Sequence, residues 1–305
     1  MHICPQGVSG IYSTPSQPLG QYQAPLSFNF AKKQITTEII MAKVLVLVPF
    51  PMSDENRQQR RDQVKAVELG PDIQFDFESV LVAPKNYVSQ YDLVLADVGM
   101  LEAGLSAQAR GYDAVCIDTM SDSGVAALRS ALDIPVIGPG RASMLMAMLL
   151  GNRFSVVTMW QHWVHLYEKT IKDLGFTNQC ASIRSIDVSP DNIGLLGGKE
   201  EEIFPLLETA AQACIEEDGA DVILLGSTTM HQAHAYLADR LPVPVINPGP
   251  LTYKLVETLL GLGLSHSRVA WPKSPAPRDD VLHAMLQKGS EFDHQTFLKT
   301  QENEE

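Results

Sequence analysis

The sequence predicts an α/β protein of two pseudo-symmetric lobes, each with a mainly parallel sheet covered by helices, and a cleft between the lobes. Three observations support this fold class. Short apolar runs alternate with segments of helical pattern, the runs resemble buried strands, and the whole pattern occurs twice along the chain. Alternating strands and helices are typical of a parallel sheet with both faces covered.

The expected strands are continuous apolar runs. Residues 44–49 read VLVLVP, and such runs are typical of parallel strands that are buried on both faces. The other expected strands are 91–97, 114–118, 134–137, 155–158, 222–226 and 243–246. The expected helices are 124–132, 142–150, 162–174, 199–217, 232–240, 251–260 and, in the tail, 279–287.

An internal repeat sets the domain organisation. Residues 111–119 (GYDAVCIDT) match 219–227 (GADVILLGS) at a constant offset of 108, and 135–140 (PVIGPG) match 244–249 (PVINPG) at an offset of 109. The repeat predicts a first lobe at 41–152 and a second at 153–270. Residues 1–40, rich in Pro, Gly, Ser and Gln, are expected to form a disordered N-terminal extension, and 271–305 a C-terminal tail.

Composition excludes several classes of partner. The chain has 305 residues, a formal net charge of -13 and no apolar run long enough to span a bilayer. Such an acidic protein is expected to bind neither nucleic acid nor an anionic membrane. The four cysteines form no CxxC pair, which favours free thiols in a reducing, cytoplasmic compartment. Neither a metal site nor a nucleotide-binding motif is present, so no cofactor is expected.

The functional cleft is expected where the two lobes face each other. Ligands bind beyond the carboxyl ends of the strands in open parallel sheets, and the repeat pairs Thr119 with Ser227 at two such ends. The residues expected to bind substrate follow the same strand ends. They are Pro49, Phe50, Ser121, Asp122, Ser123, Thr158, Thr228, Thr229 and Asn247.

The segment LGSTTMH (225–231) can carry chemistry. Ser227 lies at the turn into an expected helix, whose first N–H groups favour an anion or an oxyanion. His231 follows four residues later and can share the helix face of Ser227. Thr119, Ser227 and His231 are therefore the catalytic candidates. The alternative is structural: Ser227 caps the helix, Ser121 to Ser123 shape a turn, and His231 is a hydrogen-bonding residue beside the cleft.

Several segments resemble the aspartate/glutamate/hydantoin racemase superfamily, especially its hydantoin (allantoin) racemase-like branch, over about residues 43–270. They are DAVCIDTMSDSG (113–124), FSVVT (154–158), CASIRSI (180–186), ADVILLGSTTM (220–230) and PVINP (244–248). The resemblance implies two lobes with the substrate between them. It also implies cofactor-independent proton transfer by one cysteine from each lobe. The matching positions here are Thr119 and Ser227, and the family's early Asn-Pro-Asn loop is replaced by Val-Pro-Phe at 48–50.

Replacing both thiols changes the expected chemistry. A cysteine thiol has a pKa of about 8.5, whereas an aliphatic hydroxyl is a far weaker acid. We expect a cofactor-independent racemase or isomerase-like enzyme for a small carbonyl or carboxylate compound (hydantoin-like, imide or amino-acid-derived), with protons moved by His231, Asp118 or water. One alternative is a Ser227-dependent hydrolase or lyase, and another is a non-catalytic sensor of a small anion. The expected partner is an anionic or imide-like small molecule, and the resemblance is consistent with a homo-oligomer.

Overall fold

The computed structural model describes residues 41–191, 196, 198–276 and 278–286. All of them belong to one compact unit. The expected extension at 1–40 and the end of the tail at 287–305 lie outside the described residues. No helix in the described ranges is long and apolar enough to cross a membrane.

Two four-stranded sheets form the framework, and every pair of neighbouring strands is parallel. The first has the order β2-β1-β3-β4 and the second the order β6-β5-β7-β8, so the repeat seen in the sequence is a repeat of structure. We call these sheets, with the helices of their half of the chain, the first and second lobes. The strands are β1 (Ala42–Val48), β2 (Ile73–Ser79), β3 (Ala114–Ile117), β4 (Val136–Ile137), β5 (Phe154–Thr158), β6 (Cys180–Ser185), β7 (Val222–Leu225) and β8 (Val245–Ile246).

The expected helices are present with small shifts of their ends. The described α-helices are α1 (Asp54–Arg61), α2 (Gln90–Leu105), α3 (Val125–Ala131), α4 (Pro139–Leu150), α5 (Val164–Leu174), α6 (Glu200–Glu216), α7 (Ala233–Ala238), α8 (Pro248–Gly261) and α9 (Asp279–Leu286). Three short 3₁₀ turns accompany them: η1 (Asp62–Ala66), η2 (Gln161–Trp163) and η3 (Thr228–Met230). The predicted fold class, α/β with two helix-covered parallel sheets, is confirmed.

One strand prediction is wrong. Residues 91–97 belong to helix α2, because Ser89 caps its first turn by accepting the N–H of Asp92. The strand that pairs with β1 at the edge of the first sheet is β2. Its sequence, IQFDFES, contains charged residues, so a search for apolar runs does not detect it. An edge strand with one wet side tolerates such charges, so an apolar-run criterion misses it. Strand β6 occupies the same edge position in the second sheet and was missed as well.

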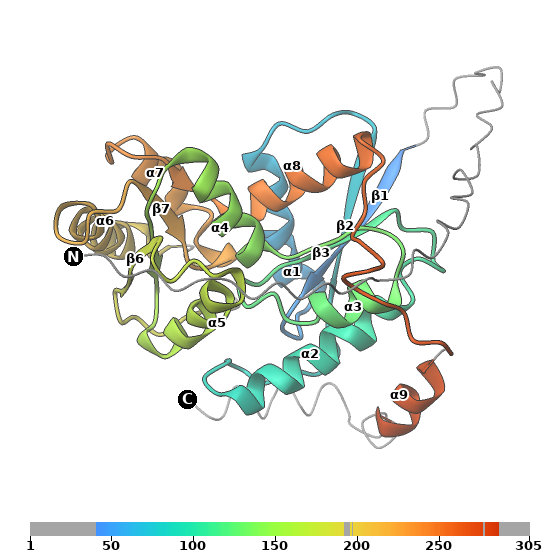
Figure 1. Cartoon of the computed structure of the whole chain (residues 1–305). Helices are drawn as coiled ribbons and strands as arrows, with labels where there is room; N and C mark the ends of the chain where they lie inside the picture. The colour runs from blue at the N-terminus through green and yellow to red at the C-terminus, as the bar shows by residue number, and fades with distance from the viewer. Residues whose placement is uncertain (1–40, 192–195, 197, 277, 287–305) are drawn as a thin grey trace, which may run out of the picture. The chain divides into compact units, whose positions relative to one another are not determined.

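The two halves exchange a helix. Helix α4 comes from the first half of the chain but contacts β7 of the second sheet, and α8 comes from the second half but contacts β3 of the first (Figure 1). Met144 of α4 lies in the hydrophobic cluster of the second sheet. Tyr253 and Val256 of α8 lie in a cluster with Val44 of β1. The exchange ties the lobes together around the strand ends that face the cleft.

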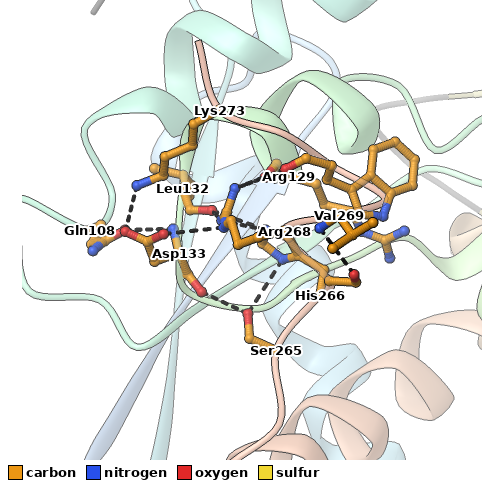
Figure 2. Close-up of polar contacts among 11 residues, drawn as sticks. Gln108, Arg129, Leu132, Asp133, Ser265, His266, Arg268, Val269 and Lys273 are labelled. Atoms are coloured by element: carbon orange, nitrogen blue, oxygen red, sulfur yellow. Dashed lines mark hydrogen bonds and ion pairs between the residues drawn. The ribbon is translucent and has the colours of Figure 1, made fainter. Parts of the chain in front are cut away.

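The segment after α8 returns to the first lobe (Figure 2). Ser265 Oγ donates to the carbonyl of Asp133 at 2.7 Å, and the Lys273 ammonium lies 2.5 Å from the Asp133 carboxylate. The Arg129 guanidinium stacks over the ring of Trp271 at 5.3 Å. The chain is therefore fixed to the loop before β4 at the point where the expected tail begins.

Candidate active site

A small cavity of about 30 Å³ lies beyond the carboxyl ends of β3 and β7. Both lobes contribute to its wall, as the repeat predicts. The lining residues are Pro49, Phe50, Arg60, Tyr87, Asp118, Thr119, Met120, Ser121, Trp163, Leu166, Tyr167, Gly226, Ser227, Thr228 and Thr229. Seven of the twelve residues predicted from the sequence to form the site are among them, including Thr119 and Ser227.

Thr119 and Ser227 are held at matching places in the two sheets. Asp118 extends β3 by donating its N–H to Leu47 at 2.9 Å, and Gly226 extends β7 by donating to Val157 at 2.7 Å. The next residue in each case turns into the cavity wall. Position 226 must be glycine, because a Cβ would lie 2.8 Å from the Tyr167 hydroxyl and 2.9 Å from the Val157 carbonyl.

Hydroxyl groups pair with one another along both strand-end loops. Thr119 Oγ1 lies 3.2 Å from Ser121 Oγ, which lies 2.9 Å from Ser123 Oγ. Ser227 Oγ lies 2.8 Å from Thr229 Oγ1 and accepts the Thr229 N–H at 3.2 Å. Ser227 therefore caps the short turn η3, which the structural alternative anticipated. Within the described contacts its hydroxyl pairs with Thr229 and not with a base.

Arg60 and Asp118 form a buried ion pair at the cavity. Arg60 Nη1 lies 3.2 Å from Asp118 Oδ2, and the two side chains are 1% and 0% exposed. Gln63 Nε2 donates to the same carboxylate at 3.2 Å. Burial raises the pKa of Asp118, while the Arg60 guanidinium acts in the opposite direction. Arg60 was missed in the sequence, because nothing in the polar run DENRQQRR distinguishes it from Arg57 or Arg61.

Thr228 links this pair to the second lobe. Its hydroxyl donates to the backbone carbonyl of Asp118 at 3.2 Å and accepts from Arg60 Nη1 at 3.3 Å. Thr228 is 2% exposed, so both contacts are shielded from water. The two lobes thus meet through a hydrogen-bonded group directly at the cavity.

The remaining wall is aromatic and apolar. The rings of Phe50 and Tyr87 lie 5.1 Å apart, and the Tyr87 hydroxyl donates to the Pro49 carbonyl at 2.8 Å. Trp163 and Leu166 line the cavity from the second lobe. Tyr87 was missed because it lies in the loop between the unrecognised strand β2 and the misassigned helix α2. This wall suits a ligand with an apolar ring or substituent.

Five predicted site residues do not line the cavity: Asp122, Ser123, Thr158, His231 and Asn247. Asp122 accepts the N–H groups of Gly140 and Arg141 at the start of α4. The Thr158 hydroxyl lies 2.7 Å from that of Tyr167. Asn247 Nδ2 donates to the His231 carbonyl at 3.4 Å. These residues support the strand-end loops from behind.

His231 differs from the expected geometry. The turn η3 ends at Met230 and α7 begins at Ala233, so no continuous α-helix places His231 on one face with Ser227. Burial lowers the pKa of His231 to about 4, so the ring is neutral near pH 7. Its Nδ1 atom is buried and has no hydrogen-bond partner among the described atoms.

Comparison with known proteins identifies the family. Residues 58–256, more than half of the chain, match the model of the Asp/Glu/Hydantoin racemase family. The chain belongs to this racemase family. It is 30% identical over 210 residues to the hydantoin racemase of Pseudomonas sp. (strain NS671), covering 68% of this chain and 83% of that protein. It is 32% identical over 188 residues to the hydantoin racemase of Rhizobium meliloti, covering 61% and 77%.

Solved structures agree. The allantoin racemase from Klebsiella pneumoniae superposes with a TM-score of 0.69 at 27% identity, covering 77% of this chain and 96% of that one. Glutamate racemase RacE1 from Bacillus anthracis shares the fold, with a TM-score of 0.53 at 14% identity. The chain is thus a racemase-like isomerase with the two-lobed fold of its family.

Among the described residues that line the cavity of this racemase-family chain, none is a cysteine. Cys116 and Cys214 are buried, Cys180 is half-buried, and burial raises the pKa of Cys180 to about 11. Within the described ranges, no group of three or more His, Cys, Asp or Glu side chains is placed to hold a metal ion. Among the described lining residues, Asp118 is the one with a carboxyl group, which in its ordinary state is ionised at neutral pH.

Proposed function

We propose that the chain is a cofactor-independent isomerase that moves a proton at an acidic carbon of a small imide or hydantoin-like compound. The observation that carries the proposal is the shared cavity of Thr119 and Ser227, which brings the matching strand ends of both halves together. The named hydantoin and allantoin racemases among its relatives support this reaction class. Both compounds hold an acidic C–H beside a carbonyl group.

Asp118 is the proposed proton acceptor, in place of the thiols that the family resemblance implied. Asp118 is a lining residue of the cavity, and burial raises its pKa toward the range in which a carboxylate is an effective base. His231, the earlier candidate, lies outside the lining and takes no direct part in the proposed step.

The proposed step is balanced in protons. The Asp118 carboxylate takes the proton from the carbon next to a carbonyl, and the C–H electron pair moves into an enolate. The hydroxyls of Thr119 and Ser227 donate hydrogen bonds to the enolate and amide oxygens. A water molecule on the side of Ser227 and Thr229, in the other lobe, gives a proton to the opposite face of the carbon. The proton held by Asp118 then passes to the resulting hydroxide through solvent, which restores both the water molecule and the carboxylate.

The charges of the cavity favour a neutral substrate. Of the described residues that line the cavity, Arg60 and Asp118 are the charged ones, and their charges neutralise each other at 3.2 Å. The carboxylate of a dicarboxylate or amino-acid substrate would lose its hydrating water in the cavity, where the Arg60 guanidinium is already paired with Asp118. Burying a charge without such a partner is costly. A cyclic imide or hydantoin is uncharged and offers amide groups to the cavity hydroxyls.

The test is deuterium incorporation from heavy water, followed by NMR with 5-benzylhydantoin, allantoin and 2-phenylsuccinimide as probes. We expect wild-type protein to exchange the acidic C–H of at least one probe. Asp118→Asn should lower the rate by about 100-fold or more. Ser227→Ala should lower it by about tenfold, because other donors remain. Circular dichroism of each variant verifies folding.

Other results would contradict this proposal. Unchanged exchange in folded Asp118→Asn would remove Asp118 from the reaction. A ring-opened product that disappears in Ser227→Ala would establish the hydrolase alternative. Probes that raise the melting temperature but never exchange or react would indicate a sensor.

A further inference from the structure

We propose that Arg60 is a positioning residue that holds the two halves of the active site in register, through Asp118 in the first lobe and Thr228 in the second. This inference rests on the proposed function only in taking the cavity as the active site. The contacts themselves are independent of which reaction takes place there.

A single nitrogen of Arg60 serves both lobes. Nη1 lies 3.2 Å from Asp118 Oδ2 and donates to Thr228 Oγ1 at 3.3 Å. The Thr228 hydroxyl in turn donates to the Asp118 carbonyl at 3.2 Å. The three residues therefore close a hydrogen-bonded ring across the cleft, which we call the interlobe clasp.

Burial makes the interlobe clasp specific. Arg60 is 1% exposed, and a guanidinium with so little access to water is stable only beside a carboxylate. Asp118 fills that need, and Gln63 Nε2 donates to both of its oxygens. Moving Arg60 away from Asp118 would leave a buried charge unpaired, so Arg60 Nη1 is a donor at a fixed position for the Thr228 hydroxyl. A flexible surface pair would not fix the position of the second lobe in this way.

The small size of the cavity makes register important. Both lobes supply its wall, so the separation of the lobes sets the width of the cavity. Thr228 is the direct neighbour of Ser227, while Asp118 is the direct neighbour of Thr119. Contacts between Thr228 and Asp118 thus set the separation of the two hydroxyls that the proposed reaction needs. Errors of about 1 Å in such an arrangement lower rates by about 100-fold.

The first test uses hydrogen exchange of the unliganded full chain, measured by mass spectrometry. Thr228→Val keeps the shape of the side chain but removes both of its hydrogen bonds. We expect exchange to become about tenfold faster around residues 227–231 and also around 118–121 in the other lobe. The matched control is Thr252→Val. Thr252 is also buried, but its hydroxyl donates within its own helix to Pro248.

Arg60→Lys provides a second variant that keeps the positive charge beside Asp118. Lysine lacks the planar fork, so we expect it to keep the protein folded but to speed exchange in both lobes as Thr228→Val does. The inference is overturned if exchange changes only in the mutated lobe, or if Thr228→Val behaves like Thr252→Val.

The second test measures kcat and KM with the probe that wild-type protein turns over. A positioning residue acts on the geometry of the reacting groups, so Thr228→Val should lower kcat by about tenfold or more with a smaller change in KM. If hydrogen exchange changes as expected but neither wild-type protein nor any variant turns over a probe, the result supports the interlobe clasp and rejects the proposed function. Lost activity with unaltered exchange would do the reverse.

Discussion

The Asp122 carboxylate accepts the backbone N–H of Arg141 at 2.7 Å and, through its other oxygen, that of Gly140 at 2.8 Å. These N–H groups open helix α4, which begins at Pro139 and has no side-chain cap of its own. Asp122 adopts a positive φ of 54°, which an aspartate tolerates better than most residues. The turn after β3 is therefore fixed to the helix that crosses to the second sheet.

Asp122 should make stability depend on pH. Burial raises its pKa to about 6, against 3.8 for the free side chain, although the two N–H donors act in the opposite direction. Between these values the folded protein holds a proton that the unfolded chain has released, so the free energy of unfolding falls as pH rises through this window. Relative to Asp122→Asn, which does not titrate, wild-type protein should lose about 2–3 kcal/mol between about pH 3.5 and pH 7. Urea unfolding across this range measures the difference, and a constant difference would contradict the assignment.

Tyr167 should support the loop of Ser227 through its hydroxyl. The hydroxyl donates to the Gly226 carbonyl at 2.5 Å and lies 2.7 Å from Thr158 Oγ1 in a fully buried setting. Tyr167→Phe leaves both groups unpaired and should lower the free energy of unfolding by about 2 kcal/mol. Tyr91 is 72% exposed, so Tyr91→Phe is the matched control and should change stability by less than about 0.5 kcal/mol. Equal effects of the two variants would argue against this role.

Arg60 and Asp118 should show strong energetic coupling. Arg60→Met leaves a buried carboxylate without its cation, and Asp118→Leu leaves a buried guanidinium, so each should cost about 3–5 kcal/mol in unfolding free energy. The double variant buries no unpaired charge and should be more stable than the sum of the single effects predicts, by about 2 kcal/mol or more. A double-mutant cycle from denaturant unfolding measures this coupling. Additive losses would mean that the two charges do not depend on each other.

The sequence predicted the framework because the central strands are unmistakable. Runs such as VLVLVP at β1 and VILLG at β7 are typical of strands buried on both faces. The constant offset between GYDAVCIDT at β3 and GADVILLGS at β7 pairs Thr119 with Ser227. The edge strand β2 and helix α2 were not predicted. Charged residues interrupt the apolar pattern of β2, and apolar residues on all sides of α2 obscure its helical periodicity. Arg60 escaped for a different reason. Its burial depends on Asp118 and Thr228, which are 58 and 168 residues away along the chain.

Restoring the two thiols tests the geometry of the cavity directly. The family resemblance implied a cysteine at each of positions 119 and 227, and both positions line one cavity here. Thr119→Cys with Ser227→Cys should therefore racemise 5-benzylhydantoin at least about tenfold faster than wild-type protein near pH 8.5, where about half of a free thiol is ionised. The rate should rise with pH through the thiol pKa, because the thiolate is the base. Each single variant should stay near the wild-type rate, since proton removal and return on opposite faces need both groups.

Thr252→Cys, a buried threonine outside the cavity, is the control. A double variant no faster than this control, though folded by circular dichroism, would show that positions 119 and 227 do not face opposite sides of one substrate carbon.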